Sequence, residues 1–191
     1  MRAGLPAHQV GRKSGSHRGK PCLGGQADST VTTAQFPVGW NILLNAGAWF
    51  VIHVGASFFT SRLPLDSFDT AGWLYRTRSW ELGGRLYERV FFIRGWKWML
   101  PDGAAAFRSG FRKRHMTGRS PEYCRTFARE TCRAELSHWL VFMLVPLFFL
   151  WDPWWVAWPM VPYAVAVNAP CIMAQRYNRP RLAALAARGA I

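Results

Sequence analysis

The chain has 191 residues, the size of one domain or of a small set of membrane helices with one polar part. Twenty-four Lys and Arg against ten Asp and Glu give a formal charge of +14, while half of the residues are apolar and eleven are tryptophan. Nucleic-acid-binding proteins share such a charge but rarely carry long apolar runs, whereas tryptophan with arginine is typical of a membrane interface. The composition therefore argues against a freely soluble protein and against a nucleic-acid partner, and it favours a protein of the lipid bilayer.

The chain opens with a basic tail, residues 1–37, which is rich in Gly and Ser and lacks apolar periodicity. We expect this tail to be disordered. Residues 38–60 follow, with no Lys, Arg, Asp or Glu over 23 positions. Because about 20 apolar residues cross the hydrocarbon core as a helix, this segment predicts a transmembrane helix. It is long for a cleaved signal peptide, and no clear cleavage site follows it.

Residues 61–135 form a predicted basic lobe that should stay in the cytoplasm. Within it, residues 86–102 mix aromatic and basic side chains, which predicts either a segment lying in the headgroup plane or an ordinary amphipathic helix, ending at Pro101. Residues 108–119 then form a basic loop that could hold anionic lipid or the phosphates of a coenzyme A donor, or simply be solvated.

Two further apolar runs, residues 136–151 and 154–174, flank the turn "WDPWW" and predict a helical hairpin, either spanning or re-entrant. A cytoplasmic basic tail, residues 175–191, follows. The predicted fold is thus an all-α integral membrane protein with about three transmembrane helices and a basic cytoplasmic lobe. The N-terminus would lie outside and the C-terminus inside. The five Lys and Arg of the first tail conflict with this topology, and translation from Val38 would remove the conflict.

A polar stripe runs into the first arm of the hairpin. Ser120 and Pro121 are a typical N-cap and first residue of a helix. At 100° per residue, one inward face then carries Cys124, Phe127, Ala128, Thr131, Glu135 and His138, whereas Arg125, Arg129 and Arg133 lie opposite on the face expected to be wet.

Ionisable groups at a membrane boundary cost free energy unless they are paired, and they are often functional. We consider His138 a candidate general base, with Glu135 or Glu130 holding the imidazole in one tautomer. The alternative is a structural pair that fixes helix contacts. A metal site is less favoured, because E-x-x-H occurs only once and no H-x-x-x-H is present.

Four motifs, "LYERVFFIRGWKWMLPD", "RETCRAELSHWL", "PLFFLWDPWW" and "NAPCIMAQRYNRPRL", resemble the glycosyl-4,4'-diaponeurosporenoate acyltransferases of staphyloxanthin-type carotenoid biosynthesis. The resemblance covers residues 39–182. It implies a multi-pass enzyme of the bacterial plasma membrane that moves a fatty acyl group onto a sugar hydroxyl of a glycosylated carotenoid or similar glycolipid. The H-x4-D box of other acyltransferases is absent, since its Asp position holds Met143.

That chemistry implies acyl-CoA or another acyl donor as co-substrate and no bound cofactor or metal. A tetrahedral oxyanion would need hydrogen-bond donors. The candidates for substrate binding gather near one membrane face of the predicted topology: Asn168, Gln175, Arg176, Tyr177, Asn178, Arg179, Trp96 and Lys97. Each of the residues from Asn168 to Arg179 could instead anchor the helix end. A membrane scaffold or assembly factor without catalytic activity is the alternative function, and it would tolerate apolar replacements in the inward stripe.

Overall fold

The computed structural model describes residues 37–100 and 120–189, and this part of the chain is helical without strands. Three helical segments in it are long and apolar enough to cross a membrane: Val38–Arg62, Pro121–Leu150 and Trp154–Arg188. The predicted all-α fold with three such segments is therefore confirmed. Residues 1–36 of the predicted tail and the predicted basic loop at residues 108–119 lie outside the described residues.

The first long helix, α1 (Val38–Arg62), buries one narrow face and exposes the rest. Its buried residues, Asn45, Trp49, Ile52, Ala56 and Thr60, recur at helical spacing. Trp49, Ile52 and Ala56 belong to a core in which Trp49 stacks on Phe148 with 4.8 Å between the ring centroids. The exposed side chains of α1 are largely apolar, as expected for a helix in contact with lipid.

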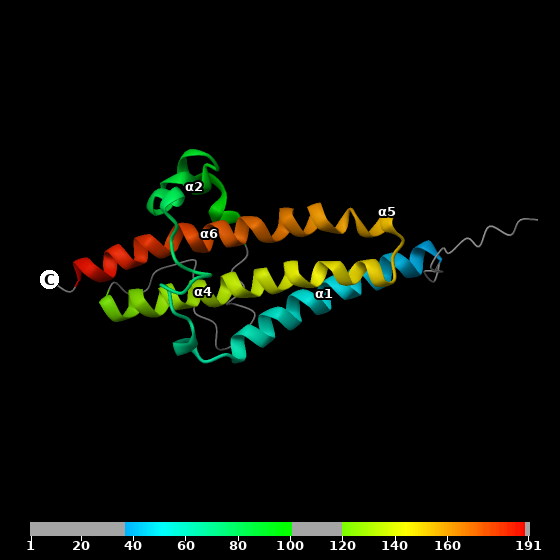
Figure 1. The fold of residues 1–191 in the computed structure, drawn as a ribbon, viewed down its shortest axis with the longest axis horizontal. Coiled ribbons are helices and arrows are strands. Elements are labelled where there is room, and N and C mark those ends of the chain that lie inside the picture. The colour runs from blue at the N-terminus through cyan, green and yellow to red at the C-terminus, as the bar shows by residue number, and fades with distance from the viewer. Residues whose placement is uncertain (1–36, 101–119, 190–191) are drawn as a thin grey trace, which may run out of the picture. The chain divides into compact units, whose positions relative to one another are not determined.

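Two longer helices, α4 (Pro121–Leu144) and α6 (Met160–Arg188), run side by side in Figure 1 and make the most extensive contact in the described part of the molecule. The Ser120 hydroxyl accepts a hydrogen bond from the Tyr123 backbone N–H at 3.2 Å, so the predicted helix start is confirmed. The 3-10 helix η5 (Val145–Leu150) and the short helix α5 (Trp154–Ala157) join the two. Helix α4 continues unbroken through residue 135, where the sequence placed the end of the lobe. Helix α6 likewise continues through residue 175, where the sequence placed the start of the C-terminal tail.

The link between α1 and α4 contains a short-helix region, residues 63–100. It consists of η1 (Leu65–Ser67), η2 (Ser79–Gly84), α2 (Arg85–Arg89), α3 (Ile93–Trp96) and η3 (Lys97–Met99), and part of it lies against α6 (Figure 1). A single amphipathic helix over residues 86–102 is therefore wrong. Tyr87 and Ile93 both pack in the core formed with α6. Six residues apart, they would project from different sides of one straight helix, so the chain turns at Phe92, whose backbone is left-handed at φ 48°.

Candidate active site

A histidine and an asparagine meet between α4 and α6. His138 lies in the C-terminal half of α4, where the polar stripe gives way to apolar residues, and its Nδ1 is 2.8 Å from Oδ1 of Asn168. Asn168 is fully buried on α6. Its amide Nδ2 donates to the Ala164 carbonyl at 2.9 Å, which leaves Oδ1 as the atom that faces the ring.

This contact sets the imidazole tautomer. An amide oxygen can only accept, so Nδ1 of His138 must carry the hydrogen in this bond. In the neutral ring the lone pair then resides on Nε2. The arrangement can therefore present an oriented proton acceptor beside the membrane-spanning part of the helix pair.

One turn before His138, the carboxylate of Glu135 is fully buried and bound by two arginines of α6. Arg176 Nε donates to Oε1 at 2.8 Å, and Arg179 Nη2 donates to Oε2 at 2.5 Å. Trp139 Nε1 also donates to Oε1, at 3.2 Å. Both oxygens of Glu135 are therefore used to join α4 to α6.

The same arginines reach the short-helix region. Arg176 Nη1 lies 2.6 Å from Glu81 Oε1, and Arg176 Nη2 donates to the Leu74 carbonyl at 2.6 Å. Arg179 Nη1 donates to the Tyr75 carbonyl at 2.5 Å. We call Glu81, Glu135, Arg176 and Arg179 the buried clamp. Its two negative and two positive groups balance in charge, which is how buried ions are tolerated.

Two tyrosines of the short-helix region lie close to the buried clamp. Tyr87 donates its hydroxyl hydrogen to Glu81 Oε1 at 3.0 Å, and burial together with this carboxylate raises the pKa of Tyr87. Burial, aided by the charge of Glu135, raises the pKa of Tyr75 to about 12. Both phenols therefore stay protonated at neutral pH.

These contacts alter the interpretation of the polar stripe. Its inward side chains from Cys124 to Glu135 are indeed buried and His138 is partly buried, but the acceptor that the structure shows on Nδ1 of His138 is Asn168 rather than Glu135. Glu130 pairs with Arg133 at 2.8 Å. Arg133 was expected on the wet face, yet its side chain is only 15% exposed, because it also donates to the Leu63 carbonyl. Arg125 and Arg129 are exposed, as expected.

Comparison with known proteins identifies the family. Residues 71–188 match the glycosyl-4,4'-diaponeurosporenoate acyltransferase family. Two curated relatives of that name come from Staphylococcus aureus (strain bovine RF122 / ET3-1) and Staphylococcus haemolyticus (strain JCSC1435). They are 30% and 31% identical over 137 and 140 residues, which covers 72% and 73% of this chain and 82% and 81% of the relatives. The chain belongs to this acyltransferase family. No solved structure matches it.

The family match confirms the resemblance noted in the sequence and makes the protein an acyltransferase. The matched region contains the His138–Asn168 contact and the whole buried clamp. Among the residues that the structure describes, no group of three His, Cys, Asp or Glu side chains is arranged to hold a metal ion.

The remaining predicted site residues of the acyltransferase lie on α6, α3 and η3. Gln175 has a buried Oε1 without a hydrogen-bond partner in the part of the chain that the structure describes. Lys97 Nζ donates to Asn178 Oδ1 at 3.4 Å and lies 4.8 Å from the ring centroid of Tyr177. Trp96 packs against the core formed with α6, and its indole N–H donates to the Phe91 carbonyl at 2.7 Å. The structure thus brings Lys97 to the polar side chains of α6 and Trp96 to its apolar ones.

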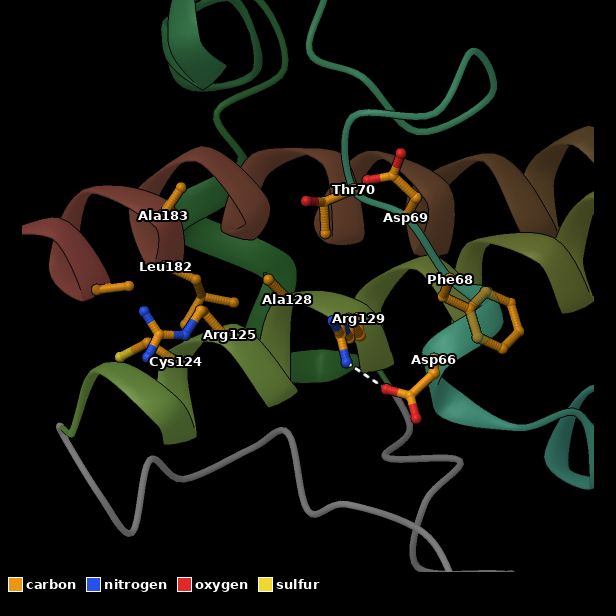
Figure 2. Close-up of a pocket in the computed structure, with 11 residues that line it drawn as sticks. Asp66, Phe68, Asp69, Thr70, Cys124, Arg125, Ala128, Arg129, Leu182 and Ala183 are labelled. Carbon is orange, nitrogen blue, oxygen red and sulfur yellow. Dashed lines mark hydrogen bonds and ion pairs between the residues drawn. The ribbon is translucent and has the colours of Figure 1, made fainter.

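A cavity of 320 Å³ lies between the first turns of α4, the end of α6 and residues 66–70 (Figure 2). Phe68, Cys124 and Leu182 supply a buried apolar floor. An ion pair of 2.5 Å joins Asp66 and Arg129 beside it. None of the residues predicted from sequence for the active site lines this cavity, so it is distinct from the His138–Asn168 contact.

Sequence reasoning missed Glu81, Tyr75 and Tyr87. No motif or periodic pattern marks Glu81, which is only 1% exposed and lies 95 residues before its partner Arg176. A weak signal for a buried carboxylate was available in the sequence of α6. Arg176 and Arg179 enter a buried helix contact, and buried arginines require carboxylates opposite them.

Proposed function

We propose that the protein transfers a fatty acyl group from a soluble donor, such as acyl-CoA, to a sugar hydroxyl of a glycosylated carotenoid or similar glycolipid held in the bacterial plasma membrane. The names of the relatives support this substrate class. Three apolar helices give the lipid tail of such an acceptor a place in the bilayer. Its sugar would reach the α4–α6 contact at the level where polar residues begin.

His138 is the proposed general base, and its contact with Asn168 is the observation that carries this assignment. Nε2 takes the proton of the sugar hydroxyl while the oxygen attacks the thioester carbonyl carbon. The tetrahedral intermediate then collapses, the C–S bond breaks, and the imidazolium returns the proton to the leaving thiolate. The products are the ester and the free thiol, so protons and electron pairs balance.

The buried clamp is proposed to position this base rather than to exchange protons. It fixes α6 against α4, and therefore Asn168 against His138. Glu130 is a weaker candidate for a direct role, since it already pairs with Arg133. Gln175 is the proposed donor to the oxyanion through its amide N–H, and Asn178 is proposed to contact the substrate beside Tyr177.

Replacing His138 by Gln tests the proposal in protein reconstituted with a glycolipid acceptor and an acyl donor. We expect normal abundance in the membrane and a loss of acyl transfer of about 10²-fold or more, the usual scale for general-base assistance. His53→Gln is the matched control, because His53 lies on α1 and its Nδ1 contacts the Trp49 carbonyl of its own helix at 2.9 Å. Full activity of His138→Gln would refute the assignment and require another residue as the proton acceptor.

A further inference from the structure

The short-helix region exposes many large apolar side chains. Phe92 is 74% exposed and Trp98 63% exposed, and four others in residues 80–99 are more than half exposed: Trp80, Leu82, Val90 and Met99. Exposed apolar side chains gathered in this way mark a surface that contacts a partner or a membrane. They lie outside the three long apolar helices.

The backbone itself holds two of these side chains outward. Leu82 at φ 50° and Phe92 at φ 48° are the non-glycine residues with positive φ in the described part of the chain. Bulky L-residues disfavour this conformation, which persists where the surroundings compensate for it. At Phe92 the packing of Tyr87 and Ile93 against α6 compensates, and it leaves the Phe92 ring exposed, where an apolar phase is more favourable than water.

Contacts with α6 fix where this surface lies. Arg176 and Arg179 bind the carbonyls of Leu74 and Tyr75, so the region is attached to a helix that can span the membrane. The same helix exposes apolar side chains such as Val165 and Val167 before it reaches these arginines. The apolar surface of the short-helix region therefore adjoins a surface that already faces lipid.

Cations gather beside the apolar side chains. Around Glu88 lie Arg181 at 2.6 Å and Arg94 at 3.8 Å, and Arg181 and Lys97 both face the ring of Tyr177. Two cations thus pair with Glu88, and a third, Lys97, lies close enough for all three charges to act on it. Burial, together with the repulsion of Arg181 and Arg94, lowers the pKa of Lys97. An added anion would relieve this repulsion.

We propose that the short-helix region is a binding site for anionic phospholipid of the membrane in which the protein resides. Its exposed apolar side chains lie among the acyl chains, and Arg94, Lys97 and Arg181 hold the headgroup phosphate. A phospholipid fits both features at once, whereas a soluble phosphate compound would leave the apolar side chains in water. This site does not depend on the proposed catalytic role of His138.

Spin labels test the apolar half. Single cysteines at Leu82 and Phe92 are labelled in the full chain after Cys22→Ser and Cys171→Ala; Cys124 and Cys132 are fully buried and remain. In phosphatidylglycerol-containing vesicles, we expect oxygen to relax both labels more than a water-soluble nickel chelate does. A label at Val51, which is exposed on α1, should also be relaxed more by oxygen than by the nickel chelate. A label at Arg188 should be relaxed more by the nickel chelate than by oxygen. Stronger relaxation by nickel, or shielding from both reagents by protein, would overturn the proposal.

The cationic half is tested in vesicles of phosphatidylcholine with and without phosphatidylglycerol. Adding phosphatidylglycerol should move the Phe92 label deeper into the bilayer, which increases its relaxation by oxygen relative to nickel. The double variant Lys97→Met, Arg181→Met should abolish this shift. Arg85→Met with Arg89→Met is the matched control, because both arginines are exposed on α2. An equal loss in both double variants would refute a specific site. A shift produced by free coenzyme A in phosphatidylcholine alone would assign the cations to a soluble phosphate and overturn the lipid proposal.

Discussion

At the scale of single residues, the orientation of His138 depends on one acceptor atom, Oδ1 of Asn168. Asn168→Leu keeps the side-chain volume but removes this acceptor. We expect its loss of acyl transfer to lie between about 10-fold and the roughly 10²-fold of His138→Gln, because the base remains but its ring is no longer held. Steady-state assays should show the loss in kcat. Asn168→Asp restores an acceptor and should recover part of the activity; equal activity of the two Asn168 variants would contradict the positioning role.

Glu135 is expected to matter for stability. Glu135→Gln leaves Arg176 and Arg179 buried without their shared carboxylate, and removing one partner of a buried pair costs about 3–5 kcal/mol. Thermal unfolding in detergent should show this loss, while Glu122→Gln, at an exposed position in the first turn of α4, should not.

A double variant sharpens this test of the buried clamp. Adding Arg179→Gln to Glu135→Gln should cost less than the sum of the two single changes, since the pair acts as one unit. If Glu135→Gln kept full stability but lost acyl transfer, the carboxylate would be catalytic, as the sequence first suggested.

The sequence predicted the inward stripe of α4 but not the partners of its polar members. Periodicity along one helix assigns Glu135 and His138 to an inward face, and the structure buries Glu135 fully and His138 in part. It cannot show which side chain of α6 lies opposite, because that depends on the register and crossing of two helices. The i,i+3 spacing made Glu135 the nearest partner of His138 in sequence. In the structure the oxygens of Glu135 are bound by Arg176 and Arg179, which lie more than forty residues away.

At the scale of elements, helix α2 is attached to α6 through Glu88. The hydrogen bond from the Tyr177 hydroxyl, together with Arg181 and Arg94, lowers the pKa of Glu88 below its ordinary 4.5. A lowered folded-state pKa means that this attachment is fully present above pH 4.5 and is lost as the pH falls through the lower folded value.

Amide hydrogen exchange of Arg85–Arg89 measures this attachment. After correction for the intrinsic pH dependence of exchange, protection of α2 should decrease below about pH 4.5. Glu88→Gln should show low protection without this pH dependence. Unchanged protection down to pH 3 in the unaltered protein would contradict the role of Glu88.

The long helices were predictable and the short ones were not. Runs free of charge located α1 and both arms of the hairpin, and Ser120 with Pro121 located the start of α4. By contrast, the break at Phe92 follows from two side chains that must reach the same neighbour, Tyr87 and Ile93, and this requirement arises only after α6 is in place.

At the scale of the whole molecule, the predicted topology places the turn between η5 and α5 outside the cell and the end of α6 inside. Trp155, in α5 directly after this turn, is 56% exposed and is a better probe than Asp152 in the turn, which is 2% exposed. In intact cells, a membrane-impermeant thiol reagent should label Trp155→Cys and not Arg188→Cys, and permeabilised cells should label both. Labelling of Arg188→Cys alone in intact cells would show that the topology is the reverse of the predicted one. Labelling of neither variant in intact cells would indicate a re-entrant hairpin.

The buried clamp also has a consequence for biogenesis. Glu81 and Glu135 emerge from the ribosome well before Arg176, which follows Glu81 by 95 residues. Until α6 is inserted, both carboxylates lack the guanidinium groups that make their burial tolerable, so neither the contact surface of α4 nor the core around Tyr87 can close. Completion of the last helix therefore acts as an assembly checkpoint. A nascent chain stalled before α6 would display uncompensated charge at the membrane surface, the kind of defect on which quality-control proteases act.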